Sequence, residues 1–128
     1  MPKNLLTLEA LSLLVEHDVF MRARSFSDLC KRIRETPCRQ LPSTRPYISS
    51  ETVSVAVDIA SALYFKPVLC LQRSAVLCSM LRRRGLPARF VVGVQQSPFQ
   101  AHAWIELDGR ILRDSFAEQQ MFQVLENC

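Results

Sequence analysis

The sequence predicts an α+β fold in which helices come first and a small antiparallel sheet follows. Apolar residues recur every three or four positions through most of residues 4–84, which is the period of a helix. After Pro87 the apolar residues alternate with others, and Asp108-Gly109 is a two-residue hairpin signal. We expect one domain over residues 1–128, with a helical lead-in and proline-rich loop over 1–48 and the main core over 49–128.

Two helices are expected at the start of the chain. The first runs from about residue 4 to 20, and helical spacing marks its apolar face as Leu5, Leu8, Leu11, Val15 and Val19. A second, shorter helix covers residues 27–34, with Ser25 or Ser27 as its N-cap. Leu29 and Ile33 are expected to point inward from it.

A proline-rich connection separates these helices from the rest. Residues 36–48 contain three prolines, so no helix continues through them, and the loop either borders a cleft or simply links two parts. The next helix opens at Ser49 or Ser50 and ends near Phe65, because Pro67 lies ahead. Its valines leave a strand over 52–57 as an alternative. Its expected buried stripe is Val53, Val57, Ala60 and Leu63 or Tyr64.

The fourth helix has the plainest boundaries. It is expected from about Leu69 to Arg84, because Gly85 is a typical helix stop and Pro87 follows it. The residues expected on its inner face are Leu71, Ala75, Cys78 and Leu81 or Arg82.

Three strands are expected after Pro87. Residues 88–95 form the first, with Phe90, Val92 and Val94 on one face. His102–Leu107 form the second, and Arg110–Arg113 return as the third after the hairpin. The tail from Ser115 is expected to pack as a helix through Phe116, Met121, Phe122 and Leu125.

Composition excludes several classes of protein. The sequence has no apolar run near the ~18 residues of a membrane span, so we expect a cytoplasmic protein. None of the five cysteines forms a C-x-x-C pair, so we expect reduced thiols, no metal site and no cofactor. The net charge is +4, but no aromatic interleaving supports nucleic-acid binding. The basic residues are therefore solvated helix faces or a docking surface for an acidic partner.

Three residues form a candidate catalytic set, Cys70, His102 and Asp114. Cys70 lies in the first turn of the fourth helix, where free backbone N–H groups and the helix dipole favour a thiolate. A nearby imidazole can hold the proton, and a carboxylate can orient the imidazole. The Asp108-Gly109 turn places His102 opposite Ser115, so Asp114 reaches the ring only if the register shifts by about one residue.

The motifs around these residues resemble a known family. The segments CLQRSAVLCSMLRRRGLPARFVVGV, PFQAHAWIELDGRIL and the following RD are similar to those of the lasso-peptide leader peptidases, members of the transglutaminase-like cysteine protease superfamily. The resemblance covers roughly residues 50 to 115. It implies a transglutaminase- or papain-like core, with a catalytic helix packed on the sheet. It also implies Cys70 as nucleophile, His102 as general base and acid, and Asp114 as orienting acid.

The resemblance further implies a substrate and partners. The substrate is the leader segment of a ribosomally made precursor peptide, cut with the help of a separate leader-binding protein and followed by an ATP-dependent macrolactam cyclase. A transglutaminase-like acyltransferase and a non-catalytic scaffold of the maturation complex remain alternatives. The second oxyanion donor is unassigned, with Tyr64 and Lys66 nearby in the sequence but no glutamine between them and Cys70.

Overall fold

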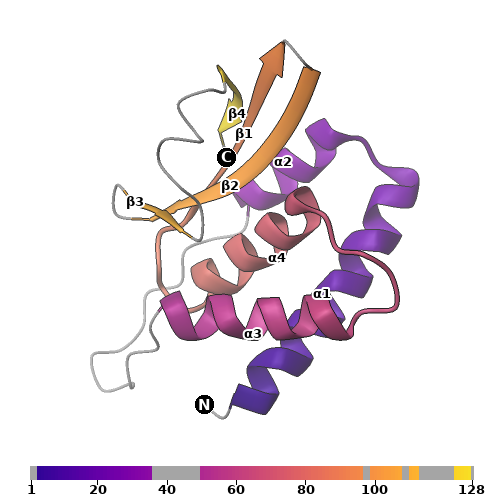
Figure 1. Cartoon of the computed structure of the whole chain (residues 1–128), viewed down its shortest axis with the longest axis vertical. Helices are drawn as coiled ribbons and strands as arrows, with labels where there is room; N and C mark the ends of the chain where they lie inside the picture. The colour runs from indigo at the N-terminus through magenta and orange to yellow at the C-terminus, as the bar shows by residue number, and fades with distance from the viewer. Residues whose placement is uncertain (1–2, 36–49, 97–98, 108–109, 113–122, 128) are drawn as a thin grey trace.

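The computed structural model describes residues 3–35, 50–96, 99–107, 110–112 and 123–127. Four helices and four strands follow one another along these residues (Figure 1). The helices are α1 (Lys3–Ala23), α2 (Phe26–Glu35), α3 (Ser50–Leu63) and α4 (Cys70–Arg83). The strands are β1 (Arg89–Gln96), β2 (Phe99–Leu107), β3 (Arg110–Leu112) and β4 (Gln123–Asn127). The α+β expectation is confirmed, with helices first and the sheet second.

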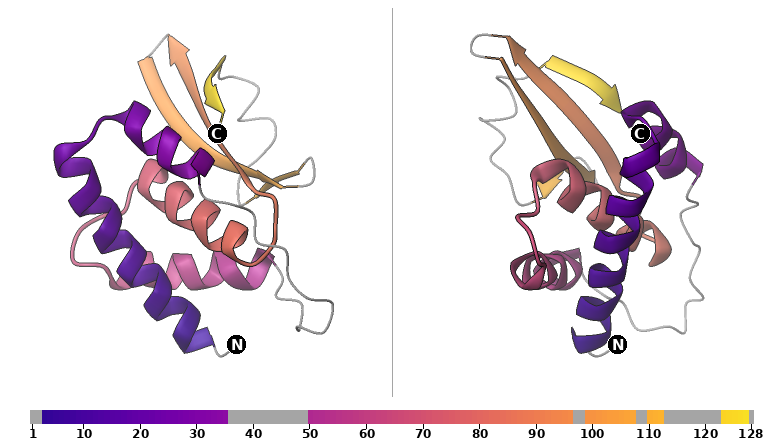
Figure 2. Two further views of the ribbon diagram at one scale, coloured as in Figure 1. Left: turned by 180° about the vertical axis from the view of Figure 1, so that it is seen from behind. Right: turned by 90° about the vertical axis from the view of Figure 1, so that its right-hand side faces the viewer.

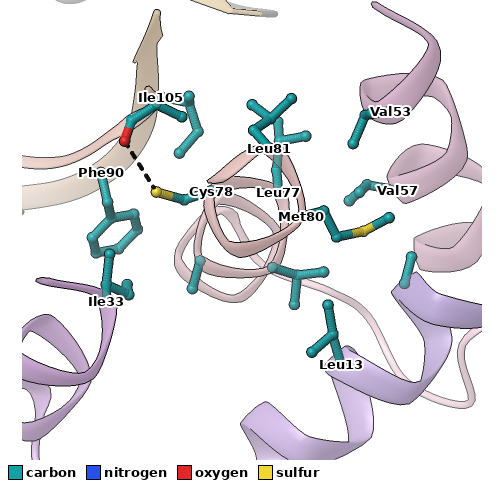
Figure 3. Packing of buried hydrophobic residues seen from close by; sticks show 14 of the residues in the cluster. Leu13, Ile33, Val53, Val57, Leu77, Cys78, Met80, Leu81, Phe90 and Ile105 are labelled. Carbon is teal, nitrogen blue, oxygen red and sulfur yellow. Dashed lines mark hydrogen bonds between the residues drawn. The ribbon is translucent and has the colours of Figure 1, made fainter. Parts of the chain in front are cut away.

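The helices gather on one side of the sheet, and α4 lies between the sheet and the pair α1 and α3 (Figure 2). The sheet is antiparallel with the strand order β3-β2-β1-β4. One hydrophobic cluster joins α1, α2, α3, α4 and the inner face of β1 and β2 (Figure 3). None of the described helices is long and apolar enough to cross a bilayer.

Helix α1 buries the face opposite to the one that the sequence predicted. Leu6, Ala10 and Leu14 are fully buried, whereas Leu8 is 60% exposed and Val19 is 61% exposed. Leu5 and Val15 are each half exposed. The helix is apolar on both sides, so spacing alone could not say which stripe α3 and α4 would cover.

Helix α2 begins as expected. The Ser25 hydroxyl accepts a hydrogen bond from the Asp28 backbone N–H at 3.3 Å, and an Asp28 carboxylate oxygen accepts one from the Ser25 N–H at 3.1 Å. This reciprocal pair satisfies two backbone donors that the helix start would otherwise leave free. Leu29 and Ile33 are buried, as predicted.

Helix α3 settles the choice over residues 52–57 in favour of helix. Val53, Val57 and Ala60 are completely buried at helical spacing, and this burial outweighs the low helix propensity of valine. Of the two alternatives for the last position of this stripe, Tyr64 packs partly buried against the core, whereas Leu63 is 67% exposed at the end of α3.

Helix α4 is the centre of the core. Most of its residues from Gln72 to Leu81 are buried, including Ala75, Cys78 and Leu81 as expected. Its C-terminal end is a Schellman motif, because the Leu86 N–H bonds the Leu81 carbonyl at 3.0 Å and the Gly85 N–H bonds the Arg82 carbonyl at 3.1 Å. Gly85 takes a φ of 81°, which a residue without a Cβ adopts easily.

The basic run at the end of α4 is partly used inside the molecule. Arg83 Nη1 lies 3.3 Å from a carboxylate oxygen of Glu9 on α1, and Arg84 also pairs with Glu9. Arg82 Nε donates to the Ala88 carbonyl at 2.8 Å. These arginines therefore join α4 to α1 and to the segment before β1.

The sheet keeps the predicted hairpin register, with Ile105 opposite Leu112 and Leu107 opposite Arg110. The helix expected in the tail is wrong for residues 123–127, which form β4 and pair with β1. Backbone N–H and C=O groups at the open side of β1 need partners, and a strand supplies them whereas a helix does not. The expected helical positions Phe116, Met121 and Phe122 lie outside the described residues.

Candidate active site

Cys70 is the first residue of α4, and its thiol is free and partly exposed. The N-cap residue Leu69 is extended, with φ −86° and ψ 168°, and makes no side-chain cap hydrogen bond. Its carbonyl accepts the first helical bond, from the Arg73 N–H at 3.0 Å. No acidic residue lies in the first turn, so the N–H groups at this end favour an anion such as a thiolate.

The start of α4 is bonded to β2 beside His102. The Ser74 hydroxyl donates to the Ala103 carbonyl at 3.2 Å, and both residues are buried. Ser74 lies one helical turn after Cys70 and therefore on the same side of α4. The elements that carry Cys70 and His102 therefore meet.

His102 lies in the middle of β2, opposite Gly93 of β1. Its ring lies beside that of Trp104, with centroids 6.0 Å apart and planes tilted by 30°. Both alternate with Ala103 and Ile105, which belong to the helix-covered core, so His102 and Trp104 are on the other face of β2. The described contacts join α4 and β2 through Ser74, and a pairing of the Cys70 thiol with the His102 ring remains a prediction.

Trp104 gives this outer face of β2 an apolar wall. It is 3% exposed, and its indole N–H donates to a Glu106 carboxylate oxygen at 3.4 Å. Val91 lies opposite Trp104 on β1 and is equally well buried. Trp104 therefore shares a face of β2 with His102.

Asp114 lies outside the described residues, so its role as orienting acid remains a prediction. The described pairs of this hairpin run from Leu107–Arg110 to Ile105–Leu112, in the register that the sequence predicted.

A polar cluster holds the segment that leads into Cys70. The Asp18 carboxylate on α1 accepts a hydrogen bond from the Tyr64 hydroxyl and lies 2.8 Å from Lys66 Nζ. The Gln72 side chain donates to the Leu14 carbonyl of α1 at 3.0 Å. Burial opposes ionisation of Asp18, but the hydrogen bonds from Lys66 and Tyr64 outweigh it and lower its pKa. Tyr64 and Lys66, the two polar residues shortly before Cys70 in the sequence, are thus bound to Asp18.

Sequence reasoning missed Asp18 and Gln72 as parts of the site. No local pattern pairs Asp18 with a tyrosine 46 positions later, because the contact exists only once α1 packs beside the end of α3. The charge at position 18 was no specific signal either, because α1 also carries Glu9 and Glu16.

A pocket of about 80 Å³ lies elsewhere, between α1, α2 and α4. Its lining includes Leu13, His17, Ile33 and Val76, but neither Cys70 nor His102. Within the described ranges, no group of three or more histidine, cysteine or acidic side chains is arranged to hold a metal ion.

Comparison with known proteins adds a family to this geometry. A family model described as the transglutaminase-like superfamily matches residues 11–127. The microcin J25-processing protein McjB of Escherichia coli is 37% identical to the chain over 46 residues, which is 36% of this chain. The aligned stretch spans only 22% of that protein's length. No solved structure matches.

Proposed function

We propose that this chain, which belongs to the transglutaminase-like superfamily, is a cysteine peptidase that removes the leader from a ribosomally made lasso-peptide precursor. In this proposal Cys70 is the nucleophile, His102 the general base and acid, and Asp114 the orienting acid. The protein acts in the cytoplasm, where thiols stay reduced. It works as one domain, with residues 49–128 as the protease core.

The observation that supports the proposal most is the setting of Cys70. It is a free, partly exposed thiol at the first position of a helix whose start is bonded to the strand that carries His102. A cysteine that serves only packing is normally buried, as Cys78 is on the same helix. The family match and the similarity to McjB, a microcin J25-processing protein, support the same assignment.

Acylation begins with the thiolate of Cys70. The thiol proton passes to the His102 imidazole, and Sγ attacks the carbonyl carbon of the scissile peptide bond. The carbonyl electron pair moves to oxygen, and backbone N–H groups at the α4 start, including that of Cys70, stabilise the resulting oxyanion. His102 then gives its proton to the leaving nitrogen. The C–N bond breaks, the core peptide departs with a free amine, and the leader stays as a thioester on Cys70.

Deacylation uses the same groups in reverse. His102 takes a proton from water as the water oxygen attacks the thioester carbonyl, and the C–S bond breaks. The leader leaves as a carboxylic acid, and Cys70 returns as a thiolate beside protonated His102. Asp114 stabilises the imidazolium in both half-reactions.

The proposal includes two partners that the family resemblance implies. A separate leader-binding protein presents the precursor, and an ATP-dependent cyclase uses the amine that cleavage frees. The freed amine is the nucleophile that a macrolactam ring requires, so cleavage must precede ring closure.

The test mixes the protein with its precursor peptide and the leader-binding protein and follows leader release by mass spectrometry. We expect Cys70→Ala to abolish release, because a methyl group cannot attack the carbonyl. The matched control is Cys78→Ala, the same change on the same helix at a buried thiol; it should cleave at nearly the wild-type rate. Cleavage by Cys70→Ala at full rate would leave the scaffold role as the better explanation.

The family name supports one competing activity, acyl transfer to an amine. An amine can attack the thioester carbonyl carbon on Cys70 as well as water can. A primary amine added to the same assay distinguishes the two. Incorporation of the amine without a hydrolysed leader would favour the acyltransferase.

A further inference from the structure

The segment between α3 and α4 exposes an unusual amount of apolar surface. Leu63 is 67% exposed, Phe65 79% and Leu69 72%. These are the three most exposed large apolar side chains among the described residues, and they lie within seven positions of one another. Single exposed apolar side chains are ordinary, but a concentration of them in one short segment is typical of a binding surface.

This segment is held firmly despite its exposure. Asp18 binds Tyr64 and Lys66, which alternate with the exposed Phe65, and the Tyr64 and Phe65 rings lie 4.7 Å apart. Gln72, just after Cys70, is bonded to α1 as well. These bonds fix the backbone before and after Cys70, so Phe65 and Leu69 are presented outward from an anchored chain.

The exposed side chains lie close to Cys70 along the chain. Leu69 is the residue before it, and Phe65 is separated from it by no more than about 18 Å of backbone. An extended peptide of about five residues spans the same length. A substrate whose carbonyl reaches Cys70 Sγ therefore comes within side-chain reach of Leu69, and its next residues on one side can reach Phe65.

The charges around this surface are balanced, which favours a neutral occupant. Lys66 is paired with Asp18, and Arg73 Nη1 lies 3.5 Å from Asp58 Oδ1. A surface with neutralised charges and exposed leucine and phenylalanine side chains attracts apolar side chains rather than acidic or basic ones.

We infer that Leu63, Phe65 and Leu69 form a substrate ledge that binds apolar side chains of the peptide on one side of its scissile bond. The inference rests on the proposed peptidase function and names the part of the site that selects the substrate. We take the peptide substrate as the ligand of this ledge because Leu69 directly precedes the nucleophile Cys70 in the sequence. Asp18 is the residue that positions the ledge.

The first arm of the test needs no precursor. The wild type and the double variant Phe65→Ala/Leu69→Ala are treated with N-benzylmaleimide or N-methylmaleimide, and modification of Cys70 is followed by peptide mass spectrometry. Alanine is chosen at position 69 because serine would add an N-cap hydrogen bond to α4. We expect the benzyl reagent to lose about tenfold in rate, since each buried apolar contact is worth a factor of that order, and the methyl reagent to be unaffected.

The second arm measures leader cleavage with the precursor and the leader-binding protein. The double variant should lose about tenfold in kcat/KM, mainly through a higher KM, because ledge contacts bind the ground state and the transition state alike. The matched control is Leu8→Ala on the exposed side of α1, which should change neither arm. Melting temperatures of all variants should stay close to the wild type, because the altered side chains are exposed.

The outcomes separate the two proposals. Unchanged kinetics in both arms would overturn the ledge, as would an equal loss in Leu8→Ala. Loss of affinity for the leader-binding protein, with the benzyl preference intact, would assign the surface to that partner instead. The wild type could fail to cleave the precursor while the double variant still loses the preference for the benzyl reagent. That result would overturn the proposed peptidase function but would support an apolar binding site beside Cys70.

Discussion

At the scale of the residue, the same side chain has different chemistry in different places. Cys78 is fully buried, with Sγ 3.6 Å from the Ala88 carbonyl, and Cys30 on α2 is also buried. Cys70 alone of the described cysteines combines exposure with a helix start. Reactivity of a thiol depends on thiolate character and access, so position rather than residue type singles out Cys70.

Tyr64 offers a residue-scale test of the bonds to Asp18. Burial raises its pKa, and the Asp18 carboxylate raises it further, to about 12 from the ordinary 10. Because the folded pKa is raised, the bond stabilises the folded protein fully below pH 10 and is lost as pH rises from 10 to about 12. In an ultraviolet absorbance titration we expect Tyr64 to ionise at a pH well above 10. The Tyr64→Phe variant identifies which part of the signal comes from Tyr64.

Asp18→Asn should return the Tyr64 pKa towards 10, because the negative charge that opposes ionisation is gone. Asp58→Asn is the matched control, since Asp58 pairs with Arg73 rather than with Tyr64. A wild-type Tyr64 that ionises at its ordinary pKa would contradict the contact.

At the scale of the element, the two ends of α4 have different tasks. Its N-terminal end lacks a side-chain cap, so the backbone N–H groups there are not used by a neighbouring side chain. Its C-terminal end is closed by the Schellman motif at Gly85, which satisfies two of the last carbonyls and starts the turn into β1. The last carbonyl groups of α4 are therefore hydrogen-bonded within the chain, whereas the first backbone N–H groups are available to bind an anion.

Gly85 tests that closure. Gly85→Ala should cost about 1 kcal/mol in free energy of unfolding, because a Cβ is strained at a φ of 81°. Gly85→Asn should cost less, since asparagine tolerates this region. Urea unfolding measures both; equal stability of alanine, asparagine and glycine would show that the positive φ is not required.

At the scale of the whole molecule, one core joins the N-terminal helices to the part that carries Cys70 and His102. Leu14 on α1, Val57 on α3 and Met80 on α4 are all fully buried in the same cluster. The helical lead-in is thus packed directly against α4, and its Asp18 fixes the approach to Cys70. Disturbing α1 should therefore affect the proposed site as well as stability.

Leu14 tests this shared core. Leu14→Ala should lower the free energy of unfolding by about 2–5 kcal/mol, because it leaves a cavity where α1 meets α3 and α4. Leu8→Ala, the same change at a position 60% exposed, should cost no more than about 0.5 kcal/mol. Chemical denaturation compares them, and a loss in Leu8→Ala as large as that in Leu14→Ala would contradict the burial of only the Leu14 face.

Features that depend on neighbours along the chain could be predicted from the sequence. Helix caps, the Gly85 stop and the Asp108-Gly109 hairpin arise from interactions within a few residues, so the α+β order, the ends of α2 and α4 and the pairing of β2 with β3 were predictable. The position of Cys70 at a helix start belongs to this group.

Features that depend on packing between distant segments became clear only from the folded structure. Helix α1 has two apolar faces, and contact with α3 and α4 selected the one that spacing had not favoured. Residues 123–127 became a strand because β1 had an unpaired side to fill. Asp18 came to hold Tyr64 and Lys66 ahead of Cys70 because α1 passes the end of α3. Helix and strand propensities depend on one segment of the sequence, whereas side-chain burial and strand pairing depend on every segment that packs at that place.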